Sequence, residues 1–164
     1  MNSVRQFILL LSALLGTQAA VAQQLQYSNP PGLPTSKNYT QIVVTQGSRI
    51  AYISGQVSAN AKGEIINKGD FRGQTKQVLE NLKIALEAVG ATFADVIKTT
   101  TYVVNTDAEK IGIVRDIRSQ YFTSAGRSAS AVDSPNPPAS TYVGVQGLYD
   151  KDVLIEIEAI VALK

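Results

Sequence analysis

The chain has 164 residues, a formal net charge of +2 at pH 7, and neither a cysteine nor a histidine. These absences exclude a Cys nucleophile, a Ser-His-Asp triad, a His general base and any zinc or copper site built on Cys or His. The near-neutral charge gives no electrostatic reason to bind nucleic acid. Because Cys and His are absent, any catalysis must use carboxylates, Tyr, Lys, Arg, hydroxyls, backbone groups and water.

The first segment, residues 1–22, is typical of a secretory signal peptide. Arg5 precedes an apolar run from Phe7 to Leu15, and the segment ends in Ala20-Val21-Ala22, an A-x-A cleavage pattern. A membrane anchor is the alternative, but Thr17 interrupts the run well short of the roughly 20 apolar residues that a span needs. We therefore expect an exported protein, periplasmic or secreted, with no membrane attachment after cleavage and a mature chain of 164 − 22 = 142 residues.

The mature chain is expected to begin with an extended lead-in that is rich in Pro, Gly and Ser. This lead-in covers residues 23–38, and residues 39–164 form the folded domain. The β-branched runs 41–46 and 49–57 flank Gly47-Ser48. Because a two-residue loop with Gly commonly joins antiparallel strands, the two runs predict a tight hairpin.

Two amphipathic helices and a strand between them are predicted next. From Asp70 the apolar period becomes helical, and Gly90 ends the stripe. Residues 95–105 are β-branched and aromatic, as in a strand. Thr106 and Glu109 form a T-x-x-E capping box for the second helix. The apolar stripes of the two helices are Thr75, Val78, Leu79, Leu82, Leu86 and Val89, then Ile111, Val114, Ile117 and Tyr121.

A loop over residues 123–138 leads to two final strands, the last of them at residues 153–163. The order strand, strand, helix, strand, helix, strand, strand predicts an α+β domain, a mixed sheet with two helices on one face. The other face of this sheet is too apolar to face water. We therefore expect self-association into a cyclic homo-oligomer, the usual form of soluble assemblies.

The last strand carries two carboxylates on one face. Side chains alternate along a strand, so Glu156 and Glu158 share a face with Leu154 and Ile160, roughly 6.5–7 Å apart along the chain. A partly buried Glu can have a raised pKa and act as an acid or base near neutrality. The alternative is a pair of solvated carboxylates on an exposed face, which composition alone favours.

For each of the other candidate residues, a purely structural role is the alternative to a functional one. Gly55, in the Ser54-Gly55 pair at a strand end, could expose its backbone to a ligand or could be an ordinary turn glycine. The hydroxyl of Tyr39 could orient a water, or its ring could simply cover the edge of the core. Lys98 could form a Schiff base if buried, or extend its ammonium group to solvent.

Taken together, these segments resemble the reactive intermediate deaminase (Rid, or YjgF-like) family. The resemblance runs from about Tyr39 to the C-terminus and rests on SGQV, Q-x-x-x-x-L-x-N-L, V-I-K-T-T and E-I-E-A-I. It implies a chorismate-mutase-like fold and a homotrimer, whose sheets pack around a central barrel with small-molecule clefts between subunits. It also implies hydrolysis of imines and enamines, such as 2-aminoacrylate, to the 2-oxo acid and ammonia, with no metal and no organic cofactor.

The resemblance assigns roles to several positions. Tyr39 matches the family's site tyrosine, and Ser54 and Gly55 match the S-G pair that lines the cleft. Glu156 matches the carboxylate that positions the attacking water, with Glu158 as its neighbour.

The chain departs from the family at the motif P-A-R-S-C, whose Arg binds the substrate carboxylate. Ser140 stands at the Arg position, followed by Thr141, and Tyr142 replaces the Cys. A hydroxyl cannot make the two-pronged contact of a guanidinium, and the loss costs on the order of 2–5 kcal/mol. Tyr142 would also narrow the cleft. Arg115 and Arg127 are the cations that could reach the cleft instead, and a surface charge is the alternative for each.

Three functions follow from these observations. The first is a cofactor-free hydrolytic deaminase for an imine or related small molecule other than 2-aminoacrylate. The second is a non-catalytic homotrimer that binds a small ligand or acts like a chaperone. The third, an endoribonuclease, ranks last because the chain is near neutral and contains no His to act as acid or base.

Overall fold

The computed structural model describes residues 24–31, 37, 40, 42–47, 49–122 and 137–164. The predicted signal peptide, Tyr39 and Arg127 lie outside the described residues. None of the helices within these ranges is long and apolar enough to cross a membrane.

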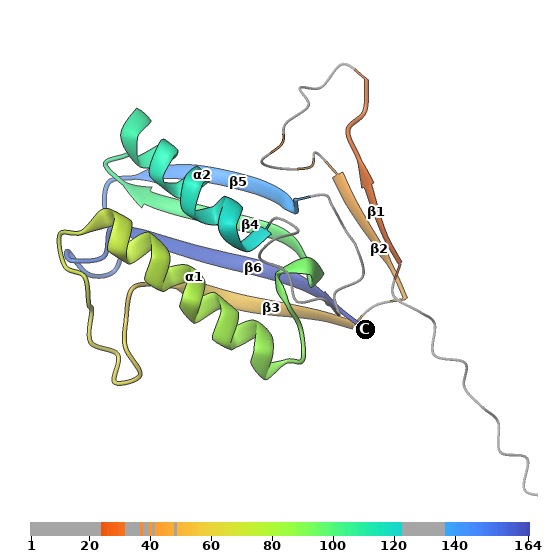
Figure 1. Cartoon of the computed structure of the whole chain (residues 1–164), viewed down its shortest axis with the longest axis horizontal. Helices are drawn as coiled ribbons and strands as arrows, with labels where there is room; N and C mark the ends of the chain where they lie inside the picture. Colours follow the sequence, from red (N-terminus) through yellow and green to blue (C-terminus); the bar gives the residue numbers. More distant parts are fainter. Residues whose placement is uncertain (1–23, 32–36, 38–39, 41, 48, 123–136) are drawn as a thin grey trace, which may run out of the picture.

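A mixed four-stranded sheet forms the centre of the domain (Figure 1). Its strand order is β3-β6-β4-β5, and β6 runs antiparallel to both of its neighbours while β4 and β5 are parallel. The four strands are β3 (Arg49–Gln56), β4 (Val96–Val104), β5 (Ala139–Val145) and β6 (Ile155–Leu163). The predicted mixed sheet is therefore confirmed, with the last strand at its interior.

Two helices cover one face of this sheet, as predicted (Figure 1). They are α1 (Phe71–Ala88) and α2 (Ala108–Phe122), and a short 3-10 helix, η1 (Phe93–Asp95), precedes β4. The core lies between the helices and the sheet. Its fully buried side chains include Val78, Leu79, Leu82 and Leu86 of α1 and Ile155, Ile157 and Val161 of β6.

The ends of α1 follow the signals in the sequence. The Asp70 carboxylate accepts the amide hydrogen of Gly73 at 2.9 Å, an N-cap bond. At the other end Gly90 has φ +72°, and the amide of Ala91 donates to the carbonyl of Leu86 at 2.9 Å. This left-handed glycine closes the helix in the manner expected from its position.

The predicted capping box at the start of α2 is wrong. The cap is Asp107, whose carboxylate accepts the amide hydrogen of Lys110 at 2.8 Å. Asp caps a helix as well as Thr does, and here the chain turns one residue later than the Thr106/Glu109 spacing requires. Thr106 instead shares a 2.8 Å hydrogen bond with the hydroxyl of Tyr142.

The predicted hairpin between residues 41–46 and 49–57 is also wrong. Strand β2 (Ile42–Gln46) pairs antiparallel with β1 (Gln24–Ser28) in the lead-in, and β3 pairs with β6. Strand β6 offers β3 a neighbour in the core-forming sheet, which the short β2 does not. The β1–β2 ribbon stays outside the main sheet, and its Ile42 and Val44 side chains are exposed.

The start of β6 is tied to α1 by one buried amide. The Gln74 side chain donates to the carbonyl of Asp152 at 2.7 Å and accepts the amide hydrogen of Leu154 at 2.9 Å. Because Gln74 is fully buried, these bonds replace water at both groups. These two bonds fix the position of the start of β6 relative to α1, just before Glu156.

Candidate functional site

Polar side chains gather on the sheet face that is opposite the helices. Alternate residues of each strand point to this face, because the intervening residues pack into the core. We call this surface the open face. Its polar residues are Tyr52 and Ser54 of β3, Lys98, Thr100 and Tyr102 of β4, Thr141 of β5, and Glu156 and Glu158 of β6.

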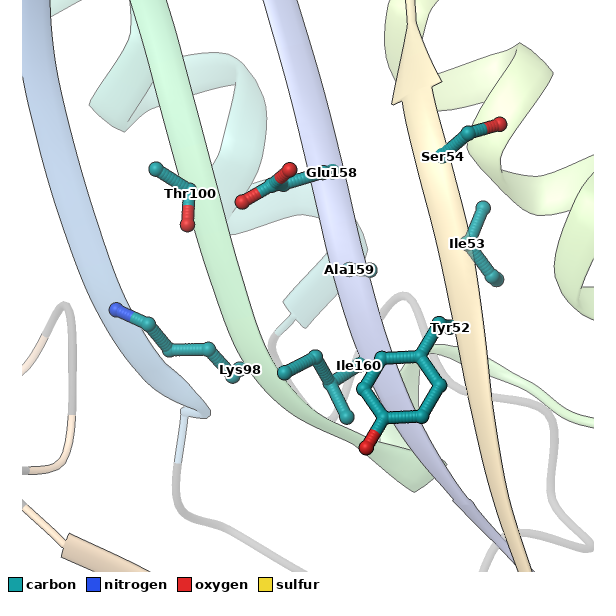
Figure 2. A pocket seen from close by; sticks show the side chains of 8 residues that line it. All are labelled: Tyr52, Ile53, Ser54, Lys98, Thr100, Glu158, Ala159 and Ile160. Carbon is teal, nitrogen blue, oxygen red and sulfur yellow. The ribbon is translucent and has the colours of Figure 1, made fainter.

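A hollow of about 370 Å³ lies on the open face (Figure 2). Lys98 and Glu158 are the charged residues of its lining, on the adjacent strands β4 and β6. In Figure 2 the carboxylate of Glu158 points toward Thr100, and the ammonium group of Lys98 points toward β5. The complete lining is Tyr52, Ile53, Ser54, Lys98, Thr100, Glu158, Ala159 and Ile160.

Glu156 packs directly against the backbone of Gly55. The register of β3 against β6 shifts between Ile53 and Gln56, so Ser54 and Gly55 form an irregularity in the strand. A Cβ atom added at Gly55 would lie 1.6 Å from Oε1 of Glu156. Gly55 is not in the left-handed region, so it is the space taken by the carboxylate that requires glycine here. The close approach predicted for this glycine is made by a side chain of the same chain.

Burial and neighbouring charge raise the pKa of Glu156. Desolvation is the larger cause, and the charge of Glu158 adds to it. Tyr102 donates its hydroxyl hydrogen to Glu158 at 3.2 Å, and burial followed by the Glu158 charge raises the pKa of Tyr102. Burial lowers the pKa of Lys98, which Glu158 partly opposes. Both carboxylates are half-buried, so Glu156 fits the partly buried alternative that the sequence offered and not the solvated one.

The P-A-S-T-Y segment divides between the two faces of the sheet. Ser140 accepts a hydrogen bond from the hydroxyl of Thr99 at 3.2 Å, and Thr99 in turn accepts one from Nη2 of Arg118 at 3.2 Å. Ser140 therefore points toward the helices. Thr141 points to the open face, where Lys98 donates to its hydroxyl. Of these positions, only Thr141 joins the polar residues of the open face.

Arg118 is a residue that the sequence analysis missed. It is only 8% exposed, and its guanidinium lies 4.5 Å from the ring centroid of Phe122. Arg115, the cation predicted from the same helix, is exposed. Arg118 lies four residues after Val114 and four before Phe122, both buried, so helical spacing could have placed it on the inner stripe.

Tyr142 and the residue after Tyr39 lie close to this segment. The Tyr142 ring packs at the border of the core, and its hydroxyl bonds Thr106. Thr40 is buried, and its hydroxyl donates to the carbonyl of Pro137 at 2.7 Å while its amide donates to that of Pro138 at 3.3 Å. These two hydrogen bonds hold Thr40, the residue after the predicted site tyrosine, against the residues that precede β5.

No group of three or more Asp or Glu side chains that could hold a metal ion occurs in the described part of the chain. The polar side chains of the open face are carboxylates, hydroxyls and one lysine.

Comparison with known proteins gives a consistent set of matches. Residues 32–163 match a family model described as Endoribonuclease L-PSP. A RutC family protein from Pyrococcus horikoshii is 37% identical over 123 residues, 74% of this chain and 84% of its own. A 2-iminobutanoate/2-iminopropanoate deaminase from Dermatophagoides farinae is 31% identical over 126 residues, covering 77% and 86%.

A solved structure also matches. The Rid-family protein YyfB from Yersinia pestis, described as of unknown function, is 35% identical with a TM-score of 0.72. The match covers 85% of this chain and 98% of that protein. The similarity thus extends over nearly the whole of the described fold.

We predict that Gly55→Ala lowers the free energy of unfolding by about 1–3 kcal/mol, because the new methyl group must displace the Glu156 carboxylate. Denaturant unfolding measures the loss. Gly112→Ala in α2, where a Cβ meets nothing within 4 Å, is the control and should not destabilise. In a Glu156→Ala background the cost of Gly55→Ala should shrink, and an unchanged cost would contradict the contact.

We predict that Glu156→Gln stabilises the protein more at pH 7 than at pH 4. A carboxyl whose pKa is raised on folding contributes stability below its unfolded pKa and loses that contribution as pH rises through the folded pKa. The neutral amide avoids this loss. Thermal unfolding across this pH range tests it, with Glu87→Gln on the exposed face of α1 as control. A pH-independent difference between variant and wild type would refute the assignment.

Proposed function

The chain belongs to the Rid (YjgF-like) family, and from this premise we propose that it is a cofactor-independent hydrolytic deaminase of reactive imines or enamines. The observation that carries the proposal is Glu156, a half-buried carboxyl of raised pKa that is held against Gly55 on the open face, two residues along β6 from Glu158, which lines the hollow. The deaminase activity named for the Dermatophagoides farinae relative supports it.

Imine hydrolysis needs a group that first accepts a proton and then returns one. Water adds its oxygen to the carbon of the protonated imine while Glu156 takes one of the water protons, which gives a neutral carbinolamine. Glu156 then returns this proton to the nitrogen, the C–N bond breaks, and the carbinolamine hydroxyl gives its proton to the departing ammonia, leaving a carbonyl compound and ammonium. A carboxyl with a raised pKa is suited to both steps, because it can exchange protons closer to neutral pH.

The neighbouring groups would set the charge around Glu156. Glu158, held by the Tyr102 hydroxyl, adds negative charge that favours a protonated Glu156 or a cationic iminium substrate. Lys98 lines the same hollow. Because Ser140 is neutral and points toward the helices, we do not propose 2-aminoacrylate as the main substrate. An exported protein would meet imines that form outside the cytoplasm, such as those released by oxidases of amines or amino acids.

We further propose that the working form is a homotrimer, with clefts between subunits at the open face. Tyr52 is 79% exposed there, and Ile50 on the same strand is 36% exposed. Large apolar groups that are exposed on a sheet face are commonly covered by another chain. A second copy would also close the hollow and exclude water from Glu156.

A non-catalytic, ligand-binding or chaperone-like homotrimer is the second candidate. The neutral Ser140 and the exposed Tyr52 favour it, since they fit the capture of an apolar or weakly polar partner as well as catalysis. We do not propose endoribonuclease activity, although the family model carries that description, because the chain has no His and a net charge near zero.

We predict that the mature protein removes imines generated by an amino-acid oxidase before semicarbazide can trap them. Glu156→Gln should reduce this rate by about 10²-fold or more, because the proton carrier is lost. Glu87→Gln, which changes an exposed carboxylate on α1, should retain the wild-type rate. Equal removal of imine by wild type and Glu156→Gln would refute the deaminase and favour the binding protein.

We predict that light scattering of the mature protein gives the mass of a trimer. Tyr52→Arg should weaken self-association by about tenfold or more, because it places a charge in the interface. Tyr149→Arg is the matched control, since Tyr149 is 73% exposed but lies in the loop before β6. A monomeric wild-type protein would exclude a site between subunits.

A further inference from the structure

We propose that Lys98 is a nucleophilic lysine, whose amine forms a reversible Schiff base with a small, uncharged aldehyde in the hollow of the open face. The sequence left open whether this lysine is buried or extends to solvent. In the structure it is half-buried and lines the hollow. Such an adduct needs neither Glu156 nor an imine substrate, so it is a second reactivity of this face that does not depend on the deaminase proposed above.

The nitrogen of Lys98 is held by a neutral group. Within the described part of the chain Lys98 forms no ion pair, and its ammonium group donates to the hydroxyl of Thr141 on β5. A hydroxyl can accept from an ammonium group and can equally donate to a neutral amine, so Thr141 can keep its bond in both protonation states. Thr141 therefore orients the nitrogen without holding it as a cation, as a paired carboxylate would.

Burial increases the share of Lys98 that is a neutral, reactive amine. A lysine attacks a carbonyl carbon only in this form. Burial lowers the pKa of Lys98, the charge of Glu158 opposes this change, and the charge of the buried Arg118 adds to it. Lys151, by contrast, is exposed, and its hydrogen bond to Asp152 raises its pKa. Lys151 is therefore a suitable internal reference for the reactivity of Lys98.

An apolar wall lies next to the amine. Ile160 pairs with Lys98 on one side and with Tyr52 on the other, so these three residues form a row across β4, β6 and β3 (Figure 2). An alkyl group can lie along Ile160 and Tyr52 with its aldehyde carbon at the nitrogen. The hollow, at about 370 Å³, is at the lower end of the range for small-molecule sites.

The charge of the lining disfavours an aldehyde that carries a carboxylate. Glu158 is the acidic residue of the lining, and among the described residues that line the hollow there is no arginine to pair with an anion. Once Lys98 has lost its proton, a carboxylate in the hollow would face the negative charge of Glu158 alone. The hollow therefore selects for an uncharged aldehyde.

The condensation is balanced without an oxidant or a reductant. The Lys98 nitrogen adds to the carbonyl carbon, and the carbonyl oxygen takes up a proton as the nitrogen loses one, which gives a carbinolamine. The nitrogen lone pair then expels the protonated hydroxyl as water. Aldehyde, neutral amine and one proton thus give a protonated Schiff base and water, and the addition of water reverses these steps.

Glu158 is the group of the lining that can carry these protons. It lies diagonally across the β4–β6 pair from Lys98, because its direct partner in the register is Thr100. Its carboxylate accepts a hydrogen bond from the hydroxyl of Tyr102 at 3.2 Å, which leaves further lone pairs of its two oxygens for a proton from the hollow.

The test incubates the mature protein with butanal and cyanoborohydride, which reduces the C=N bond to a stable secondary amine. Peptide mass spectrometry then follows the labelling of each lysine. Lys98 should be labelled about tenfold faster than Lys151 or more, because the hollow holds the aldehyde next to the amine. Lys98→Arg should remove this fast labelling, and Lys151→Arg should leave it unchanged.

Two comparisons test the ligand class. 4-Oxobutanoate is the butanal chain with a terminal carboxylate, so it should label Lys98 about threefold more slowly than butanal, as expected for a partly screened like charge. Glu158→Gln should narrow this difference. Ile160→Ala removes part of the apolar wall and should slow the labelling of Lys98 by butanal about threefold or more, with no change at Lys151.

Three results would overturn the proposal. They are labelling of Lys98 no faster than that of Lys151, an unchanged rate in Ile160→Ala, and labelling by 4-oxobutanoate that equals or exceeds labelling by butanal. No imine substrate is present in this experiment. The labelling of Lys98 and the removal of imines can therefore fail separately, and a failure of one does not decide the other.

Discussion

The burial of one side of β6 is the constraint on which the rest of the structure depends. Ile155, Ile157 and Val161 are fully buried beneath the helices, and a strand alternates its side chains. Glu156 and Glu158 are therefore forced to the opposite face, in the interior of the sheet. There they lose much of their water and face each other's charge, which is the source of the raised pKa of Glu156.

Much of the fold could be predicted from short-range patterns. The alternation in residues 153–163, the helical stripe after Asp70 and the stop at Gly90 each depend on neighbours in sequence, and each is confirmed. The pairing of β3 could not be read in this way. Its turn signal at Gly47 is local, whereas its partner β6 lies about a hundred residues further along the chain. The predicted cap of α2 was wrong for a smaller reason. Thr106 and Asp107 are adjacent residues that can both cap a helix, and the structure uses Asp107.

Site residues could be predicted where motifs that resemble those of the family fall on the open face. They could be predicted less well where the direction of a side chain decides its role. The sequence placed Ser140 at a ligand-binding position, but only the structure shows that it points to Thr99 and Arg118. Arg118 was missed because a charged residue on an amphipathic helix is usually exposed. A buried arginine on the inner stripe is an exception that depends on the packing of Phe122 and β4 around it.

The contact between Gly55 and Glu156 has a consequence for how such chains can diverge. Because the carboxylate occupies the volume of a methyl group at position 55, a residue larger than glycine cannot enter there while Glu156 stays. Drift at this pair should be concerted, with a larger residue at 55 tolerated only after 156 has become smaller. In a newly sequenced relative, the residue at 55 would then report whether space for a carboxylate has been retained, even where the strand around it has diverged.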